Sequence, residues 1–99
     1  MRSILLSNSD VVVQNFATGV LERLGLGYAE LCAINPRIIL ASISGYGQTG
    51  PWRNYMAYGP AAAALSGLCS VTGYVDGGPE ELGLSMPDPT SGTIMNSAM

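Results

Sequence analysis

The chain has 99 residues and a mass of 10.3 kDa, which is enough for one domain, and 47% of its residues are hydrophobic. Only 11% are charged, against roughly 25% in an ordinary soluble domain, so a monomer would expose large apolar patches. The absence of histidine excludes Ser-His-Asp and Cys-His catalysis and His-metal sites, and the absence of lysine excludes Schiff-base chemistry. We therefore expect part of a larger body, or a subunit packed against others, without a metal ion.

The charges, the apolar runs and the cysteines indicate which binding partners and which cellular location to expect. Seven carboxylates and four scattered arginines give a net charge of −3, which argues against a nucleic-acid partner. No apolar run approaches the roughly 20 residues of a membrane span, and the N-terminus lacks a signal-peptide core, so we expect no membrane association and a cytoplasmic location. Cys32 and Cys69 lack metal-site spacing and are expected to be reduced thiols.

The first half of the chain predicts two parallel strands joined by helices. Residues 3–8 resemble the end of a helix, and the β-branched run at 10–14 predicts a strand buried on both faces. Thr18 is the expected N-cap of a short helix that Gly25 ends, and a second helix is expected over about 28–34. Residues 38–44 give the strongest strand signal, which completes a βαβ unit.

The second half is richer in turns. The segment 45–52 carries three glycines directly after the second strand, where ligands bind in open α/β sheets. It either wraps an anion with its backbone N–H groups or is a plain turn, and the nearby Tyr and Trp residues either stack on a purine or pack in the core. A helix over about 60–68 and a turn-rich stretch over 72–87 follow. The next helix is expected to start with Asp88 as N-cap and Pro89 in its first turn.

Asp88 is the carboxylate that stands apart. Glu22, Glu30, Glu80 and Glu81 lie in contexts typical of solvated charges, whereas Asp88 opens a helix, where the dipole and free N–H groups stabilise an anion. The residues alone leave two interpretations open. Asp88 is either a structural cap or a nucleophile that attacks an acyl carbonyl to form a mixed anhydride.

Four motifs in order bring in a resemblance: Asp10-Val-Val-Val-Gln-Asn-Phe, Gly19-Val-Leu-Glu-Arg-Leu-Gly-Leu-Gly-Tyr28, Asn35-Pro-Arg-Ile-Ile39 and Ser42-Ile-Ser-Gly-Tyr-Gly-Gln-Thr-Gly-Pro51. With them the chain resembles the family III CoA-transferases, the CaiB/BaiF family, over nearly its whole length. The resemblance implies that residues 1–99 are an incomplete part of the Rossmann-like large domain of the α/β fold. A first strand and helix would precede Met1, and a second domain would follow Met99. It also implies coenzyme A and acyl-CoA as substrates with no prosthetic group, a carboxylic acid as acceptor, and an interlocked homodimer for the complete protein.

The resemblance also assigns residues. Asp88 matches the aspartate that forms an aspartyl anhydride and then an aspartyl-CoA thioester. Asn15 and Phe16 match residues beside the CoA, and Tyr58 matches a tyrosine near CoA and the active site. Family members often have Arg-Pro after the Asn-Phe pair, whereas this chain has Ala17 and Thr18.

Two alternatives accompany this prediction. The related α-methylacyl-CoA racemases use a histidine at the position of Tyr58, so the resemblance favours a transferase. The second alternative is a non-catalytic chain, either a truncated fragment or a subunit that only packs with partners. For the isolated 99-residue chain we expect no activity.

Overall fold

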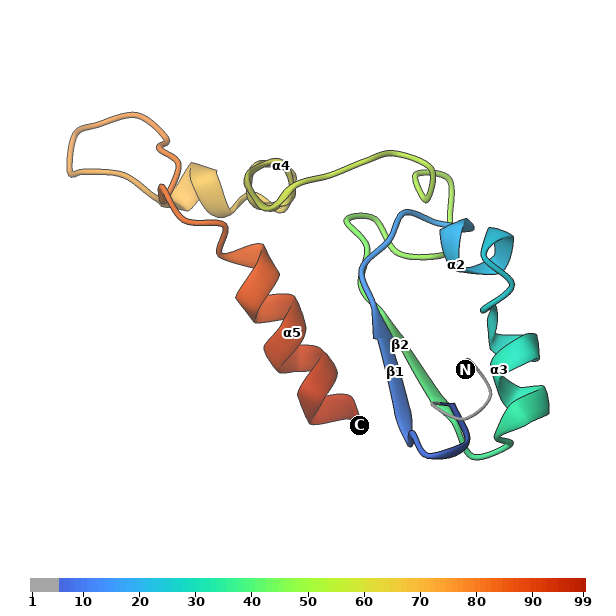
Figure 1. The fold of residues 1–99 in the computed structure, drawn as a ribbon. Coiled ribbons are helices and arrows are strands. Elements are labelled where there is room, and N and C mark those ends of the chain that lie inside the picture. Colours follow the sequence, from blue (N-terminus) through green and yellow to red (C-terminus); the bar gives the residue numbers. More distant parts are fainter. Residues whose placement is uncertain (1–5) are drawn as a thin grey trace. The chain divides into compact units, whose positions relative to one another are not determined.

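The computed structural model describes residues 6–99, which divide after Asn54 into two compact units. The N-terminal unit, up to Asn54, contains β1 (Val11–Gln14), α2 (Val20–Arg23), α3 (Tyr28–Ile34) and β2 (Ile39–Ser42). The C-terminal unit, Tyr55–Met99, contains α4 (Gly59–Leu65), the 3-10 helix η1 (Leu68–Val71) and α5 (Pro87–Ala98). Figure 1 shows these elements in chain order from blue to red.

The two strands pair in parallel, in a register that places Val11 opposite Ile39 and Gln14 opposite Ser42. Both strands are built from β-branched and apolar residues, and α2 and α3 form the crossover that a parallel pair requires. This confirms the predicted βαβ unit and the parallel pairing. The α/β class predicted from the sequence is therefore correct.

Burial of the strands on both faces is not observed. Val13 is 58% exposed, whereas Gln14 beside it is buried. Successive side chains of a strand point to opposite faces, and the crossover helices of one βαβ unit cover one face only. The other face carries Val11 and Val13, both of which are exposed.

The core of the N-terminal unit lies between the sheet and the crossover. Its buried apolar side chains are Leu21 of α2, Leu31 of α3, Ala41 of β2, and Ile38, which directly precedes β2. Helix α3 has the predicted bounds, and Gly25 follows α2 with a φ of 68°, as expected for a glycine that ends a helix. Thr18 is not the N-cap, because Gly19 occupies that position and makes no side-chain cap.

The helices of the C-terminal unit differ from the prediction at their ends. The helix predicted over 60–68 begins at Gly59, ends at Leu65, and is followed by the separate 3-10 turn η1. Helix α4 packs against η1 and α5, with Ala63 buried. Within the described residues, none of these helices is long and apolar enough to cross a membrane.

The exposed apolar side chains lead to a first prediction. Val75, Met56 and Val13 are among many large apolar residues that the described chain leaves open to solvent. We expect the 99-residue chain to sediment as dimers or larger species, because apolar patches of this extent are rare on soluble monomers. The association should persist at high salt, which weakens charge pairs but not apolar contacts. A monodisperse monomer in analytical ultracentrifugation would contradict the prediction.

Candidate functional site

Asp88 lies in the first turn of α5. The helix begins at Pro87, so Asp88 is its second residue and not its N-cap as the sequence suggested. The backbone N–H of Asp88 donates to the carbonyl of Ser85 at 3.0 Å, which fixes the turn that leads into the helix. The side chain is exposed, at the positive end of a helix of 12 residues. A ligand can therefore reach this carboxylate from solvent.

Ser85 holds one oxygen of this carboxylate. Its hydroxyl donates a hydrogen bond to Oδ2 of Asp88 at 2.8 Å. The other oxygen, Oδ1, accepts no hydrogen bond from the residues that the structure describes. The two oxygens of Asp88 therefore differ: one is restrained, and one is available to react.

Sequence reasoning missed Ser85, although a signal was present. A serine three residues before an aspartate is the spacing of a capping box, in which each side chain bonds to the backbone N–H of the other residue. Here the serine lies outside the helix and bonds to the side chain of Asp88 rather than to a backbone N–H group.

Gly59, the first residue of α4, completes this arrangement. It is buried, and a Cβ added to it would overlap the Ser85 hydroxyl, lie 2.8 Å from Cβ of Ser85, and lie 3.0 Å from Oδ1 of Asp88. The start of α4 thus approaches the Ser85–Asp88 pair so closely that any side chain at residue 59 requires Ser85 to shift. Tyr58, the predicted CoA-side residue, directly precedes Gly59, and its side chain is 80% exposed. The structure therefore brings the Tyr58–Gly59 backbone and Asp88 together within one unit.

Asn15 and Phe16 belong to the N-terminal unit and follow β1 at its carboxyl end. Both are exposed, and the Phe16 backbone N–H donates to the side-chain oxygen Oε1 of Gln14 at 2.7 Å. Gln14 is 8% exposed, so a buried side chain fixes the direction in which the chain leaves the strand. Gln14 was not among the predicted site residues, because a glutamine at the end of an apolar run carries no distinctive motif.

The glycine-rich loop follows β2 at the same edge of the sheet. Thr18, from the loop after β1, donates its hydroxyl to the carbonyls of Arg53, at 2.8 Å, and Gly47, at 3.5 Å. These hydrogen bonds connect the two loops that follow the carboxyl ends of the strands. The carboxyl ends of parallel strands are where open α/β sheets bind ligands. Tyr46 and Trp52 pack edge to face with ring centroids 5.9 Å apart, so this aromatic pair stabilises the loop itself.

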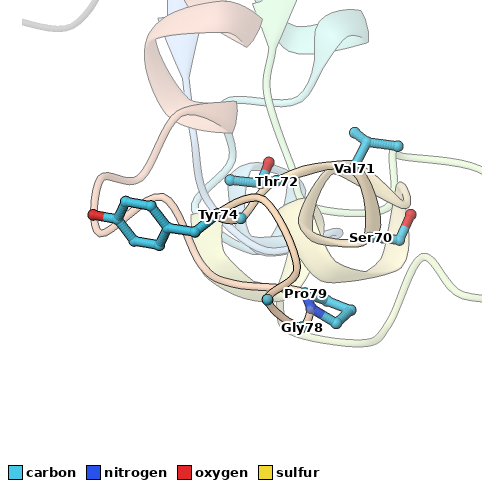
Figure 2. A pocket seen from close by; sticks show the side chains of 8 residues that line it. Ser70, Val71, Thr72, Tyr74, Gly78 and Pro79 are labelled. Carbon is cyan, nitrogen blue, oxygen red and sulfur yellow. The ribbon is translucent and has the colours of Figure 1, made fainter.

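A shallow hollow in the C-terminal unit is lined by none of the predicted site residues. Its volume is about 220 Å³, and η1 and the following turn form its walls. Figure 2 shows the Tyr74 ring pointing away from the turn. No carboxylate, thiol or arginine lines the hollow, which is built from Ser70, Val71, Thr72, Gly73, Tyr74, Gly77, Gly78 and Pro79. Its polar side-chain groups are the hydroxyls of Ser70, Thr72 and Tyr74, and those of Ser70 and Thr72 donate to the backbone carbonyls of Gly67 and Leu68.

Comparison with known proteins places this geometry in a family. The family model described as CoA-transferase family III matches residues 3–99. The acetyl-CoA:oxalate CoA-transferase of Acetobacter aceti is 46% identical over 92 residues, which cover 92% of this chain and 24% of the relative. The succinyl-CoA:glutarate CoA-transferase of Homo sapiens is 45% identical over 90 residues, which cover 91% of this chain and 20% of the relative.

The fold agrees with a solved structure of the same kind. The crystal structure of a CaiB/BaiF family protein from Brucella suis superposes with a TM-score of 0.84 at 35% identity, covering 98% of this chain and 27% of that one. The chain thus spans about a fifth to a quarter of the length of these relatives. From the match over residues 3–99 and the shared fold, the chain belongs to CoA-transferase family III.

Proposed function

We propose that this chain supplies the nucleophile of a CoA-transferase that moves coenzyme A from an acyl-CoA to a carboxylic acid. The observation that carries the proposal is Asp88, an exposed carboxylate with one oxygen restrained by Ser85 and the other without a hydrogen bond from any residue of 6–99. A restrained carboxylate with an accessible oxygen suits nucleophilic attack, because its orientation is set before the substrate arrives.

The first half of the reaction transfers CoA to the protein. Oδ1 of Asp88 attacks the acyl carbonyl, the C–S bond breaks, and the CoA thiolate leaves with the electron pair. The product is a mixed anhydride between Asp88 and the acyl group. The thiolate then attacks Cγ of Asp88, the bond from Cγ to Oδ1 breaks, and the donor leaves as a carboxylate. Asp88 is left as a thioester of CoA.

The second half repeats these steps with the acceptor. An oxygen of the acceptor carboxylate attacks Cγ, the thiolate leaves again, and a second anhydride forms. Attack of the thiolate on the acceptor carbonyl then releases the new acyl-CoA and restores Asp88. No oxidant, water or external proton donor is consumed, which agrees with a site whose nearest side-chain partner is a hydroxyl.

The CoA-side residues are proposed from the same family. Asn15 and Phe16 at the carboxyl end of β1, and Tyr58 at the start of α4, are exposed and available to contact CoA. The named relatives act on acetyl-CoA with oxalate and on succinyl-CoA with glutarate, so we assign the substrate class rather than one pair. An interlocked dimer and a cytoplasmic location complete the proposal.

The test uses a complete family III chain in which residues 1–99 occupy their aligned segment; we call this the complete enzyme. After incubation with an acyl-CoA, denaturing mass spectrometry should show a CoA adduct on the peptide that carries Asp88, and hydroxylamine should remove it. Turnover with an acceptor carboxylate labelled with ¹⁸O should leave one heavy oxygen on that peptide, because the restored Asp88 keeps one acceptor oxygen. Turnover with neither adduct nor label would overturn the nucleophile. An inert complete enzyme that still binds CoA would support the non-catalytic alternative.

A further inference from the structure

We infer that Ser85 is a positioning residue that stabilises the charge on Oδ2 of Asp88 whenever Cγ is attacked, and that Gly59 keeps the space that the Ser85 hydroxyl needs. The inference rests on the proposed function and concerns the same site. It is based on two observations at the starts of α4 and α5. The Ser85 hydroxyl donates a hydrogen bond to Oδ2 of Asp88, and Gly59 lies close to both Ser85 and Asp88.

The chemistry gives the two oxygens of Asp88 different tasks. Oδ1 attacks and later departs with the donor carboxylate, whereas Oδ2 stays on Cγ throughout. When the thiolate attacks the anhydride at Cγ, the electron pair of the Cγ–Oδ2 double bond moves onto Oδ2. It returns as the bond to Oδ1 breaks. The same happens when the acceptor carboxylate attacks the thioester.

A donor aimed at Oδ2 therefore acts on the steps at Cγ. The Ser85 hydroxyl already lies 2.8 Å from this oxygen, within the range in which a donor stabilises an oxyanion. It keeps its proton, so it acts by hydrogen bonding and not as an acid. In the resting carboxylate the same bond sets the orientation that presents Oδ1.

Gly59 explains why the serine can occupy this position. Any Cβ at residue 59 would overlap the Ser85 hydroxyl and would also crowd Oδ1 of Asp88. Its φ lies outside the left-handed region, so the obstacle to alanine here is space and not backbone strain. An alanine at this position must push Ser85 away from Asp88, and the hydrogen bond is lost without any change at Ser85 itself.

The experiment compares variants of the complete enzyme by rapid-quench mass spectrometry of the aspartyl-CoA thioester. Ser85→Ala should slow thioester formation about tenfold to a hundredfold, somewhat less than the usual cost of a lost oxyanion donor because water can partly replace the hydroxyl. The KM for acyl-CoA should stay close to wild type, since the inference places the effect of Ser85 on Asp88 and not on CoA binding. Ser85→Thr, which retains a hydroxyl, should recover most of the rate.

Thr93→Val is the matched control. Thr93 also donates its hydroxyl within α5, to the Pro89 carbonyl at 2.9 Å, but does not contact Asp88. This variant should form the thioester at the wild-type rate. If it slows the reaction as much as Ser85→Ala does, Ser85 has a merely structural role and the inference is wrong.

Gly59 is tested by a double-mutant cycle. Gly59→Ala alone should reproduce the slow thioester formation of Ser85→Ala, and the double variant should be no slower than Gly59→Ala, because both changes remove one interaction. Additive losses would contradict the proposed dependence. Wild-type rates in Ser85→Ala, with an adduct still present on the Asp88 peptide, would overturn this inference and leave the nucleophile intact. Absence of the adduct from the unmodified complete enzyme during turnover would overturn the proposed function itself.

Discussion

Replacement of Asp88 by asparagine is expected to abolish CoA transfer in the complete enzyme while leaving CoA binding largely unchanged. The amide has the size of the carboxylate, and its oxygen can still accept the hydrogen bond from Ser85. It is neutral, however, and cannot attack an acyl carbonyl to form an anhydride. Loss of a nucleophile typically costs about 10⁴-fold or more in kcat, so turnover should fall to the limit of detection.

The measurement combines steady-state kinetics with CoA binding by isothermal titration calorimetry. Asp76→Asn is the matched control, since Asp76 is another exposed aspartate of the C-terminal unit. Asp76 has a φ of 63°, a conformation that asparagine tolerates well, so the control should keep both stability and activity. Wild-type turnover in Asp88→Asn would end the assignment of the nucleophile. Loss of CoA binding along with turnover would instead indicate that Asp88 helps to hold CoA.

The pairing of the strands could be predicted because the signals are local. Two β-branched runs separated by helical spacing permit few arrangements, and the parallel crossover is the simplest of them. The bounds of α3 could be predicted for the same reason, since a proline disfavours a helical conformation in the residue before it, and Asn35 and Pro36 follow directly after Ile34. The burial of the strands was predicted wrongly, because composition cannot say which face the crossover helices will cover.

Asp88 shows what a motif contributes and what it leaves out. The resemblance selected the residue, but the predicted N-cap, Asp88, lies two residues after the observed N-cap, Met86. A proline is well suited to a first helical turn, and the chain offers two, Pro87 and Pro89, so the choice between them depends on the packed structure. Thr18 failed as an N-cap for a similar reason. Its hydroxyl finds the Arg53 carbonyl across the loops instead of an N–H group of the adjacent helix.

The contact between Gly59 and Ser85 lay beyond sequence reasoning. The two residues are far apart in the chain, and a glycine before an alanine-rich helix does not by itself indicate a close contact. Only the packing of α4 against α5 shows that a side chain at residue 59 would overlap Ser85. Local patterns therefore predict the elements, whereas the surroundings of Asp88 depend on contacts between elements.

The prediction with the largest expected effect on stability concerns Leu31, which is 1% exposed in α3 between the helices and the sheet. Leu31→Ala should cost about 2–5 kcal/mol, because the lost apolar contacts leave a cavity that a small core cannot close. A unit of this size has a free energy of unfolding of roughly 3–8 kcal/mol, so the variant should lose most of it.

Ile34→Ala in the same helix is the control, because Ile34 is 41% exposed and its truncation leaves no comparable cavity. Urea unfolding of the 99-residue chain, followed by far-UV circular dichroism at one fixed concentration, should show a large drop in midpoint for Leu31→Ala and a small one for Ile34→Ala. Equal shifts in the two variants would mean that Leu31 is not the centre of the core, and that the contact between α3 and the strands is looser than its burial implies.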